Sequence, residues 1–559
     1  MSATTPFLNS ANFGNDVAAA AAAAQPGGGT VVLDPGTYTI AVDTTIAPNV
    51  TLVAPQGAML DINAGVTLTI AGGLLADRYA IFSGAGSVSF GAAGATLLTA
   101  VFPEWFGSGA LQTALYAAAG SRIPLVLANT VYDTGTAGLT VTQNYACILG
   151  LASPVGTPSS IPVDEQCAVI SYSGPGTAIE VGQNIGGDTW TNNTRFENFR
   201  VVCSNVAANA IDFWQVGGVR IEGVTAYNSA TAGTTTGIGI RFRGAIDTEV
   251  AFVDINNFAI GIQVTLGTGN GPSTTVTVRK CYLHYCNIGF SNIGSWAELL
   301  DTILESNRQY GLQTLAQSAR TTVTTCWLEN NSRHAYTDNQ SYAYFNDCVF
   351  VSYLNQPFFF DVLQAGQMHF ANCRFMGPDG GILFNPAAGI TSGAQISFYA
   401  PAFNIPPGEP LYIGDGTFPS PALGGAFHAP FFSMTRTRYE FVNNVPVTPG
   451  SSALMRCGAS PNTSYLMSFS GHVVGINIYY SSVPVSGTWG YSVQKNGATL
   501  FSNSSLAGQS EMDEAEHLRY TFNPGDTLGV VLTIDGSFAQ PNGTFFAELI
   551  VALGDDGTV

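Results

Sequence analysis

Two glutamates occupy equivalent positions in neighbouring repeats of the sequence. Glu305 lies in the segment LLDTILESN and Glu329 in VTTCWLENN. If these segments are strands of adjacent coils, their backbones would be about 4.8 Å apart. Carboxyl groups that close repel each other as anions, so one of them would keep its proton. Glycoside cleavage uses such a pair, with separations of about 5–5.5 Å in retaining and about 6.5–9.5 Å in inverting enzymes. The sequence leaves that choice open.

Aromatic and basic residues stand near the two glutamates. Trp327 and Tyr282 precede the glutamate column by two residues and are suited to stack on sugar rings, and His284 could donate a hydrogen bond or shuttle a proton. Arg308 and Arg333 could bind the carboxylate of an acidic sugar or stabilise the enolate-like intermediate of a lyase. A simpler interpretation makes the glutamates turn caps, the arginines their salt-bridge partners and the tryptophan a subunit contact.

A second polar column is expected on the strand that follows. It could form a saccharide groove or a plain solvated surface, and its members are Asp212, Arg241, Gln263, Ser291, Gln313, Thr337 and Asp361. We count Asp361 among the substrate-binding candidates, and Asp338 and Asp361 are reserve catalytic carboxylates. Three further aspartates precede the inward columns and are interpreted as turn residues: Asp254, Asp301 and Asp347. No clustered acidic, CxxC or His-rich motif predicts a metal site, and no cofactor is expected.

An internal repeat must position these residues. Across roughly residues 195–385 the units recur every 21 to 31 residues or so, which is the spacing of β-helix coils. They read FENFRVVCSN, IEGVTAYNS, FVDINNFAIGI, VRKCYLHYCNIGF, LLDTILESNRQYGL, VTTCWLENNSRHAY, FNDCVFVSYLNQ and FANCRFMGPDGGILF. Each coil contributes short strands and turns, and buries its core against the next coil.

Two columns of the repeat should point inward, because side chains alternate between the two faces of a strand. The first contains Phe199, Val224, Ile255, Cys281, Thr302, Cys326, Cys348 and Cys373. The second contains Val201, Ala226, Asn257, Leu283, Leu304, Leu328, Phe350 and Phe375. The four aligned cysteines are therefore interpreted as a buried stack of free thiols rather than as redox or metal-binding groups.

Three regions follow from these patterns. Residues 1–105 are expected to form an N-terminal cap or attachment region, with a short helix followed by strands in residues 12–39 and the same plan again in residues 106–133. Residues 106–425 would form the parallel β-helix, and the repeat stops around residues 426–435. Residues 436–559 contain regularly spaced strands with NG, PG and DG turns, which favours a β-sandwich of the jelly-roll kind.

Composition excludes several classes of function. Only 10% of the residues are charged, the formal net charge is −19 and no run of Lys or Arg occurs, so nucleic acid is not an expected partner. No stretch reaches membrane-spanning length without polar interruption, and the N-terminus lacks the features of a secretory signal. The nine cysteines are an odd number, which argues against a disulfide framework.

The helix-and-strand plan of the N-terminal region, the PEWFG segment at 103–107 and the repeated coils resemble pectate-lyase-like bacteriophage tailspikes and tail-fibre depolymerases. The resemblance implies an all-β fold, namely a right-handed parallel β-helix with a C-terminal β-sandwich. It also implies a homotrimer in the virion, made in the host cytoplasm, attached to the phage tail, baseplate or an adaptor protein, and acting on a bacterial surface polysaccharide. Hydrolysis is the expected reaction. The alternatives are a polysaccharide lyase, a non-catalytic receptor-binding fibre and a cellular pectinase-like enzyme.

Overall fold

The computed structural model divides the chain into two compact units. The first covers residues 1–427 except 370–372 and 397–409, which group with residues 428–559 in the second. The structure describes residues 7–91, 98–154, 166–182, 190–267, 271–352, 358–363, 366–376, 381–384, 395–399, 402–404, 412–414, 436–443, 449–457, 463–467, 471–481, 486–504, 511–523, 525–539 and 544–553. The predicted end of the repeat at residues 426–435 lies outside these ranges.

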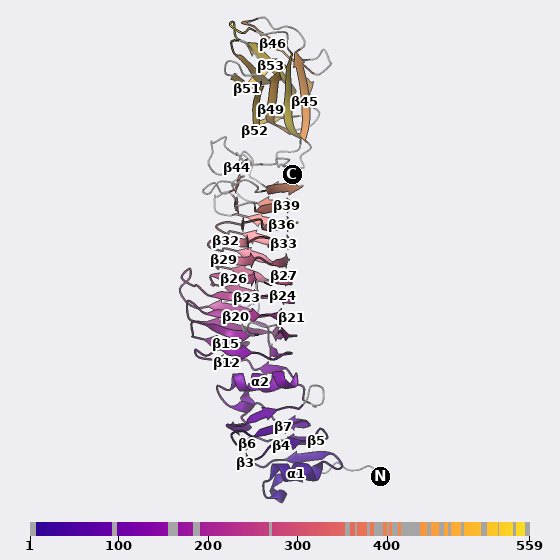
Figure 1. Ribbon diagram of the computed structural model, residues 1–559, viewed down its shortest axis with the longest axis vertical. Coiled ribbons are helices and arrows are strands. Elements are labelled where there is room, and N and C mark those ends of the chain that lie inside the picture. The colour runs from indigo at the N-terminus through magenta and orange to yellow at the C-terminus, as the bar shows by residue number, and fades with distance from the viewer. Residues whose placement is uncertain are drawn as a thin grey trace. The chain divides into compact units, whose positions relative to one another are not determined.

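Three parallel sheets, to each of which a coil adds one strand, contain most of the described strands between residues 125 and 414 (Figure 1). Sheet I contains β11 (Leu125–Leu127), β14 (Cys147–Gly150), β17 (Thr191–Asn192), β18 (Arg195–Glu197), β21 (Val216–Glu222), β24 (Ile246–Ala251), β27 (Thr274–Arg279), β30 (Trp296–Leu300), β33 (Arg320–Thr324), β36 (Tyr342–Asn346), β39 (Gln367–Ala371) and β42 (Gln395–Tyr399). Sheet II contains β12 (Val131–Asp133), β15 (Ala168–Tyr172), β19 (Phe199–Cys203), β22 (Thr225–Asn228), β25 (Asp254–Asn256), β28 (Tyr282–His284), β31 (Ile303–Glu305), β34 (Trp327–Glu329), β37 (Val349–Val351), β40 (Arg374–Met376) and β43 (Ala402–Asn404). Sheet III contains β13 (Leu139–Val141), β16 (Thr177–Val181), β20 (Asn209–Trp214), β23 (Ile238–Arg243), β26 (Ile260–Thr265), β29 (Ile288–Ile293), β32 (Tyr310–Leu315), β35 (Ala335–Thr337), β38 (Phe358–Val362), β41 (Gly381–Phe384) and β44 (Tyr412–Gly414). The predicted parallel β-helix is confirmed.

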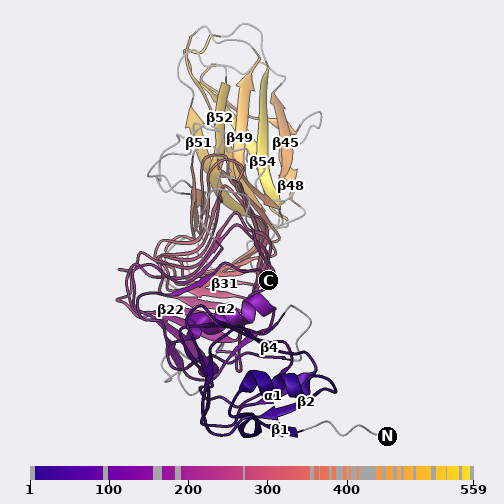
Figure 2. The same ribbon diagram turned by 60° about the horizontal axis from the view of Figure 1, so that its bottom comes forward.

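The N-terminal region is itself a short stack of parallel coils. Its three sheets contain β1 (Phe7–Asn9), β2 (Gly29–Val32), β5 (Val50–Val53) and β8 (Gly73–Leu75); β3 (Gly36–Ile40), β6 (Ala58–Ile62) and β9 (Phe82–Gly84); and β4 (Thr44–Ile46), β7 (Thr67–Ile70) and β10 (Ser87–Ser89). Short 3-10 helices cover Ser10–Phe13 and Pro103–Phe106. The predicted helices are α1 (Val17–Ala24), whose first turn is capped by the Asp16 carboxylate, and α2 (Leu111–Ser121). Figure 2 shows α1 beside β1 and β2.

The inward columns of sheet II form the core of the coils. The aligned cysteines 281, 326, 348 and 373 are buried and form no disulfide, as predicted, and burial raises the pKa of Cys281 to about 12. Two assignments were wrong by two residues. Ile255 pairs with Leu283 and so belongs to the second inward column, which leaves Asn257 outside it. Asn257 instead follows the strand and donates hydrogen bonds to the carbonyl groups of Asn228 and Ala230.

A column of glycines on sheet III makes room for stacked asparagines. Its members are Gly239, Gly261, Gly289 and Gly311, and a Cβ at each of the first three would lie 2.5–2.7 Å from the carbonyl oxygen of the next glycine. A Cβ at Gly289 would also lie 2.8 Å from Asn307 Nδ2. The Asn307 amide donates to the Leu283 carbonyl (3.1 Å) and to Asn331 Oδ1 (2.8 Å), so it satisfies buried acceptors between coils.

Eight consecutive coils, from β18–β19 to β39–β40, turn from sheet I to sheet II at a residue with left-handed backbone. This corner column contains Asn198, Gly223, Phe252, Lys280, Asp301, Thr325, Asp347 and Asn372, with φ between 48° and 63°. The amide of a corner residue donates to a carbonyl of the next coil, for example Asp301 N to Thr324 O at 3.1 Å. Asp301 and Asp347 are therefore turn residues, as predicted.

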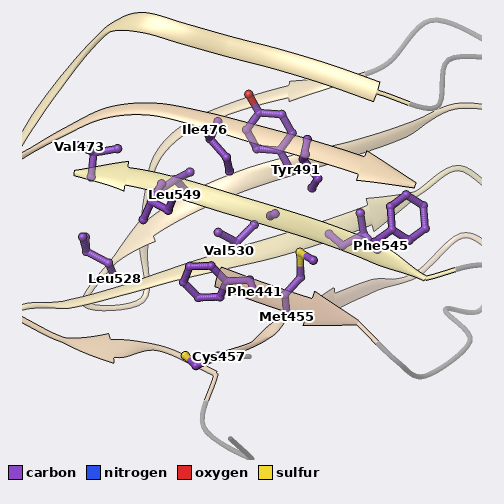
Figure 3. Packing of buried hydrophobic residues seen from close by; sticks show 14 of the residues in the cluster. Phe441, Met455, Cys457, Val473, Ile476, Tyr491, Leu528, Val530, Phe545 and Leu549 are labelled. Atoms are coloured by element: carbon purple, nitrogen blue, oxygen red, sulfur yellow. The ribbon is translucent and has the colours of Figure 1, made fainter. Parts of the chain in front are cut away.

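Within the second unit, the described strands between residues 436 and 553 form a sandwich of two antiparallel sheets, as predicted. One contains β45 (Arg436–Asn443), β47 (Arg456–Cys457), β49 (Gly471–Tyr480), β52 (Glu511–Phe522) and β54 (Phe545–Leu553). The other contains β46 (Ser452–Leu454), β48 (Tyr465–Leu466), β50 (Trp489–Lys495), β51 (Ala498–Ser504) and β53 (Thr527–Ile534). Figure 3 shows the core between them, where Phe441, Ile476, Tyr491, Val530 and Leu549 are buried.

The glycine column generates a test of the coil packing. Gly289→Ala should destabilise the protein by about 1–3 kcal/mol, because the new methyl group would overlap the Gly311 carbonyl and the Asn307 amide. Gly120→Ala is the matched control: no atom lies within 4 Å of its added Cβ, and alanine favours the α2 helix. Melting temperatures measured by calorimetry should fall for the first variant and stay level or rise for the second. Equal values would contradict the assigned packing.

Candidate functional site

The outward face of sheet II carries two rows of side chains over four consecutive coils. The first row contains Asp254, Tyr282, Ile303 and Trp327, and the second contains Asn256, His284, Glu305 and Glu329. Glu305 and Glu329 are direct register partners on β31 and β34 and both are half-buried. The structure therefore places the carboxylates of Glu305 and Glu329 on neighbouring strands, as the sequence predicts.

Each glutamate accepts a hydrogen bond from an aromatic side chain of the same face. The Tyr282 hydroxyl donates to Glu305 Oε2, and the Trp327 indole nitrogen donates to Glu329 Oε2 at 2.6 Å. Burial and the bond to Glu305 raise the pKa of the Tyr282 phenol, so it remains a donor at neutral pH. Oε1 of each glutamate has no hydrogen-bond partner within the described part of the chain, and is available to a ligand.

His284 is fixed between two neighbours. Its Nε2 lies 2.9 Å from Asp254 Oδ1, and its ring stacks on Tyr282 with centroids 3.9 Å apart. Asp254 is thus a site residue, and its interpretation as a turn residue was wrong. It pairs with Tyr282 across the strands, whereas the corner of that coil is Phe252. His284 is only 8% exposed and its Nδ1 is buried without a partner among the described residues.

The two glutamates and their aromatic neighbours line a surface depression of about 390 Å³. Its other lining residues are Asp301, Thr302, Ile303 and Thr325, so two corner residues form one edge. The Thr325 hydroxyl donates to Asp301 Oδ1 along that edge.

The two predicted arginines do not pair with these glutamates in the described part of the chain. Arg308 Nη1 donates to the Tyr285 carbonyl, and Arg333 forms an ion pair with Asp361. Asp361 lies on sheet III, is 1% exposed, and also accepts a hydrogen bond from the Tyr310 hydroxyl at 3.1 Å. Arg333 and Asp361 therefore belong to a second cluster, and grouping Arg333 with Glu329 was wrong.

The predicted polar column on sheet III is present, but Tyr336 occupies the position that was assigned to Thr337. Gln313 pairs with Tyr336 and Tyr336 with Asp361, so Thr337 does not belong to it and is buried instead. At its other end Asp212 is clamped by Arg241 and Arg243. Burial raises the pKa of Asp212 to about 6, against the opposing effect of Arg241.

Two residues of the site, Asp254 and Thr325, are not among the site residues predicted from the sequence. Asp254 was assigned to the wrong column because a shift of two residues preserves the alternation of faces. Thr325 was not nominated, since a β-branched residue is an unusual choice for left-handed backbone. Its signal was positional: it occupies the place in its repeat that Asp301 and Asp347 occupy in theirs.

Within the described ranges, no group of three or more His, Cys, Asp or Glu side chains is arranged to hold a metal ion. None of the helices there has the length and apolar character needed to cross a membrane.

No family model matches the chain, and neither does any curated protein sequence. Solved structures similar to it include the enzymatically active domain of tailspike protein 4 of bacteriophage CBA120, with 9% identity and a TM-score of 0.36 over 82% of this chain and 67% of that one. The tailspike protein of Acinetobacter phage vB_ApiP_P1 is 12% identical, with a TM-score of 0.39 over 81% and 88% of the two chains. An alginate lyase from Paenibacillus sp. str. FPU-7 is 14% identical, with a TM-score of 0.28 over 68% and 98%.

The second cluster yields a prediction about stability. Arg333→Met should cost about 3 kcal/mol, because it leaves the buried Asp361 carboxylate without its counter-ion. Asp361→Asn should cost less, about 1–2 kcal/mol, because the Arg333 side chain is 37% exposed and can turn to water. The order of the two melting temperatures checks the assignment. A larger loss for Asp361→Asn would show that the carboxylate is not isolated by burial.

Proposed function

We propose that this protein is a bacteriophage tailspike that binds and depolymerises a bacterial surface polysaccharide by glycosidic hydrolysis. The observation that carries the proposal is the pairing of Glu305 with Glu329 in register on an outward face, within an open depression. Tyr282 and Trp327, which line the same depression, are suited to contact sugar rings.

Hydrolysis assigns one role to each glutamate. One carboxylic acid protonates the leaving glycosidic oxygen, and the other carboxylate activates water or attacks the anomeric carbon. Tyr282 and Trp327 each hold one oxygen of a glutamate, which orients the free Oε1 atoms. His284, fixed by Asp254, is close enough to Tyr282 to support its position. These residues supply an acid, a base and aromatic contact surface without a cofactor.

The partners follow from the same proposal. A parallel β-helix provides a surface on which several sugar units can lie, and its N-terminal coils and C-terminal sandwich resemble the end regions of tailspikes. We infer a homotrimer carried on the phage tail, either directly or through an adaptor protein. The glycan would be a capsular polysaccharide, an exopolysaccharide or an O-antigen at the bacterial surface.

Glutamine substitutions test the catalytic pair. Glu305→Gln and Glu329→Gln should each lower the rate of glycan cleavage by 10²–10⁴-fold, because glutamine neither donates nor accepts the required proton. Purified protein is incubated with extracted capsular and lipopolysaccharide glycans, and polymer size, new reducing ends and unsaturated-uronate absorbance are followed together. Glu298→Gln is the control, since Glu298 is a half-buried outward glutamate of sheet I and should be silent.

The products separate the alternatives. New reducing ends without unsaturated uronate support hydrolysis, and unsaturated uronate identifies a lyase. Glycans that are bound and never shortened identify a non-catalytic receptor-binding fibre. One observation favours the non-catalytic fibre. Both glutamates accept hydrogen bonds from side chains of the same face, and these bonds would equally stabilise a surface that only binds glycan.

Tyr282→Phe tests whether the tyrosine orients Glu305. The variant loses the hydroxyl that donates to Glu305 but keeps the ring that stacks on His284. We expect kcat to fall about tenfold, as for the loss of one hydrogen bond to a charged group, while KM and the melting temperature stay nearly constant. An unchanged kcat would remove Tyr282 from the catalytic arrangement, and a rise in KM alone would make it a binding residue.

A further inference from the structure

The corner column contains residues that its backbone conformation does not favour. All eight corner residues have φ between 48° and 63°, a region that glycine, asparagine and aspartate enter far more readily than other residues. Below the site the corners are Asn198 and Gly223, and above it they are Asp347 and Asn372. These four coils follow the preference.

The coils of the candidate site depart from it. Their corners are Phe252, Lys280, Asp301 and Thr325, which lead directly into β25, β28, β31 and β34. A β-branched or bulky residue at positive φ is a strained choice. Three such residues occur on the four coils that carry Asp254, His284, Glu305 and Glu329, and strain of this kind tends to gather at functional sites.

Local contacts do not account for the three residues. Phe252 is 38% exposed, and both the Lys280 ammonium (5.4 Å) and the Arg279 guanidinium (5.6 Å) lie over its ring. Each exposed cation–π contact stabilises the protein by less than left-handed backbone costs at one ordinary residue. The two contacts together therefore offset less than Phe252 and Lys280 cost. Thr325 is exposed and donates to Asp301 Oδ1, a bond that an asparagine amide could also make. Stability alone would therefore favour asparagine at all three corners.

We propose that Phe252, Lys280 and Thr325 form a saccharide-binding rim along the edge of sheet II, retained because their side chains contact the glycan. This inference rests on the proposed function and extends its site from the depression across four coils. Phe252 supplies a ring face for a sugar, Lys280 donates to hydroxyl or carboxylate oxygens, and the Thr325 hydroxyl stands on the edge of the depression itself. Successive corners are about 4.8 Å apart, so the rim follows a chain that runs along the coils.

Strain relief tests the rim. Phe252→Asn, Lys280→Asn and Thr325→Asn should each raise the melting temperature by about 1–2 °C, since asparagine accepts the left-handed conformation. Each should also weaken glycan retention about tenfold. Retention is measured by affinity electrophoresis through gels cast with the extracted bacterial glycans, using the Glu305→Gln, Glu329→Gln double variant so that the probe is not cut. Asp347→Asn, at a corner of the next coil, is the matched control and should change neither quantity.

The outcomes distinguish the rim from the proposed function. Higher melting temperatures with weakened retention support the rim. Unchanged retention overturns the rim, and leaves the proposed function standing if the wild-type protein still shortens the glycan. Lower melting temperatures overturn the strain argument on which the rim depends. If the double variant retains no glycan and the wild-type protein shortens none, both proposals fail together.

Discussion

The hydrogen-bonded register between parallel coils is the constraint on which the rest of the first unit depends. It places every side chain about 4.8 Å above its equivalent in the preceding coil, so a residue must be compatible with a whole column rather than with one neighbour. Cysteines recur at one inward position, and four glycines recur at another because the next carbonyl leaves no room for a Cβ. The stacked asparagines fill the space that these glycines leave and satisfy carbonyl groups of neighbouring coils.

The same register explains what the sequence could predict. Alternation of apolar and polar residues correctly predicts the faces of the eight strands of sheet II from β19 to β40, including the inward cysteines and leucines. Alternation is unchanged by a shift of two residues, however, so it could not place Asp254 and Asn257. The corner residue fixes the register of a coil, and in this one the corner is Phe252, which no turn preference would select. At Thr337 the shift was a single residue, which exchanged the buried and outward faces of β35.

The residues of the candidate site differ in the same way: those on strands could be placed from the sequence, and those in turns could not. Four of its residues lie on regular strands: Glu305, Glu329, Trp327 and Tyr282. The sequence predicts that they lie close together, because they occupy equivalent positions in successive units of the repeat. Arg308 and Arg333 lie in the turns that follow those strands, where side-chain direction depends on backbone angles that residue types do not specify. Arg333 consequently faces sheet III and Asp361, although it is only four residues from Glu329. When a turn lies between two residues, their separation in the sequence does not show whether their side chains are close in space.

Coil geometry also limits the kind of ligand that such a face can bind. On these four strands of sheet II, each coil offers two outward residues and one corner residue, so a single coil cannot surround a small molecule. The carboxylate pair already needs two coils, its hydrogen-bond donors extend it to three, and Asp254 extends it to four. A ligand that makes use of all these groups must itself be extended along the coils. A polysaccharide chain meets that requirement, because its units repeat along one direction as the coils do, and the inward columns provide the rigidity that keeps successive contacts in line.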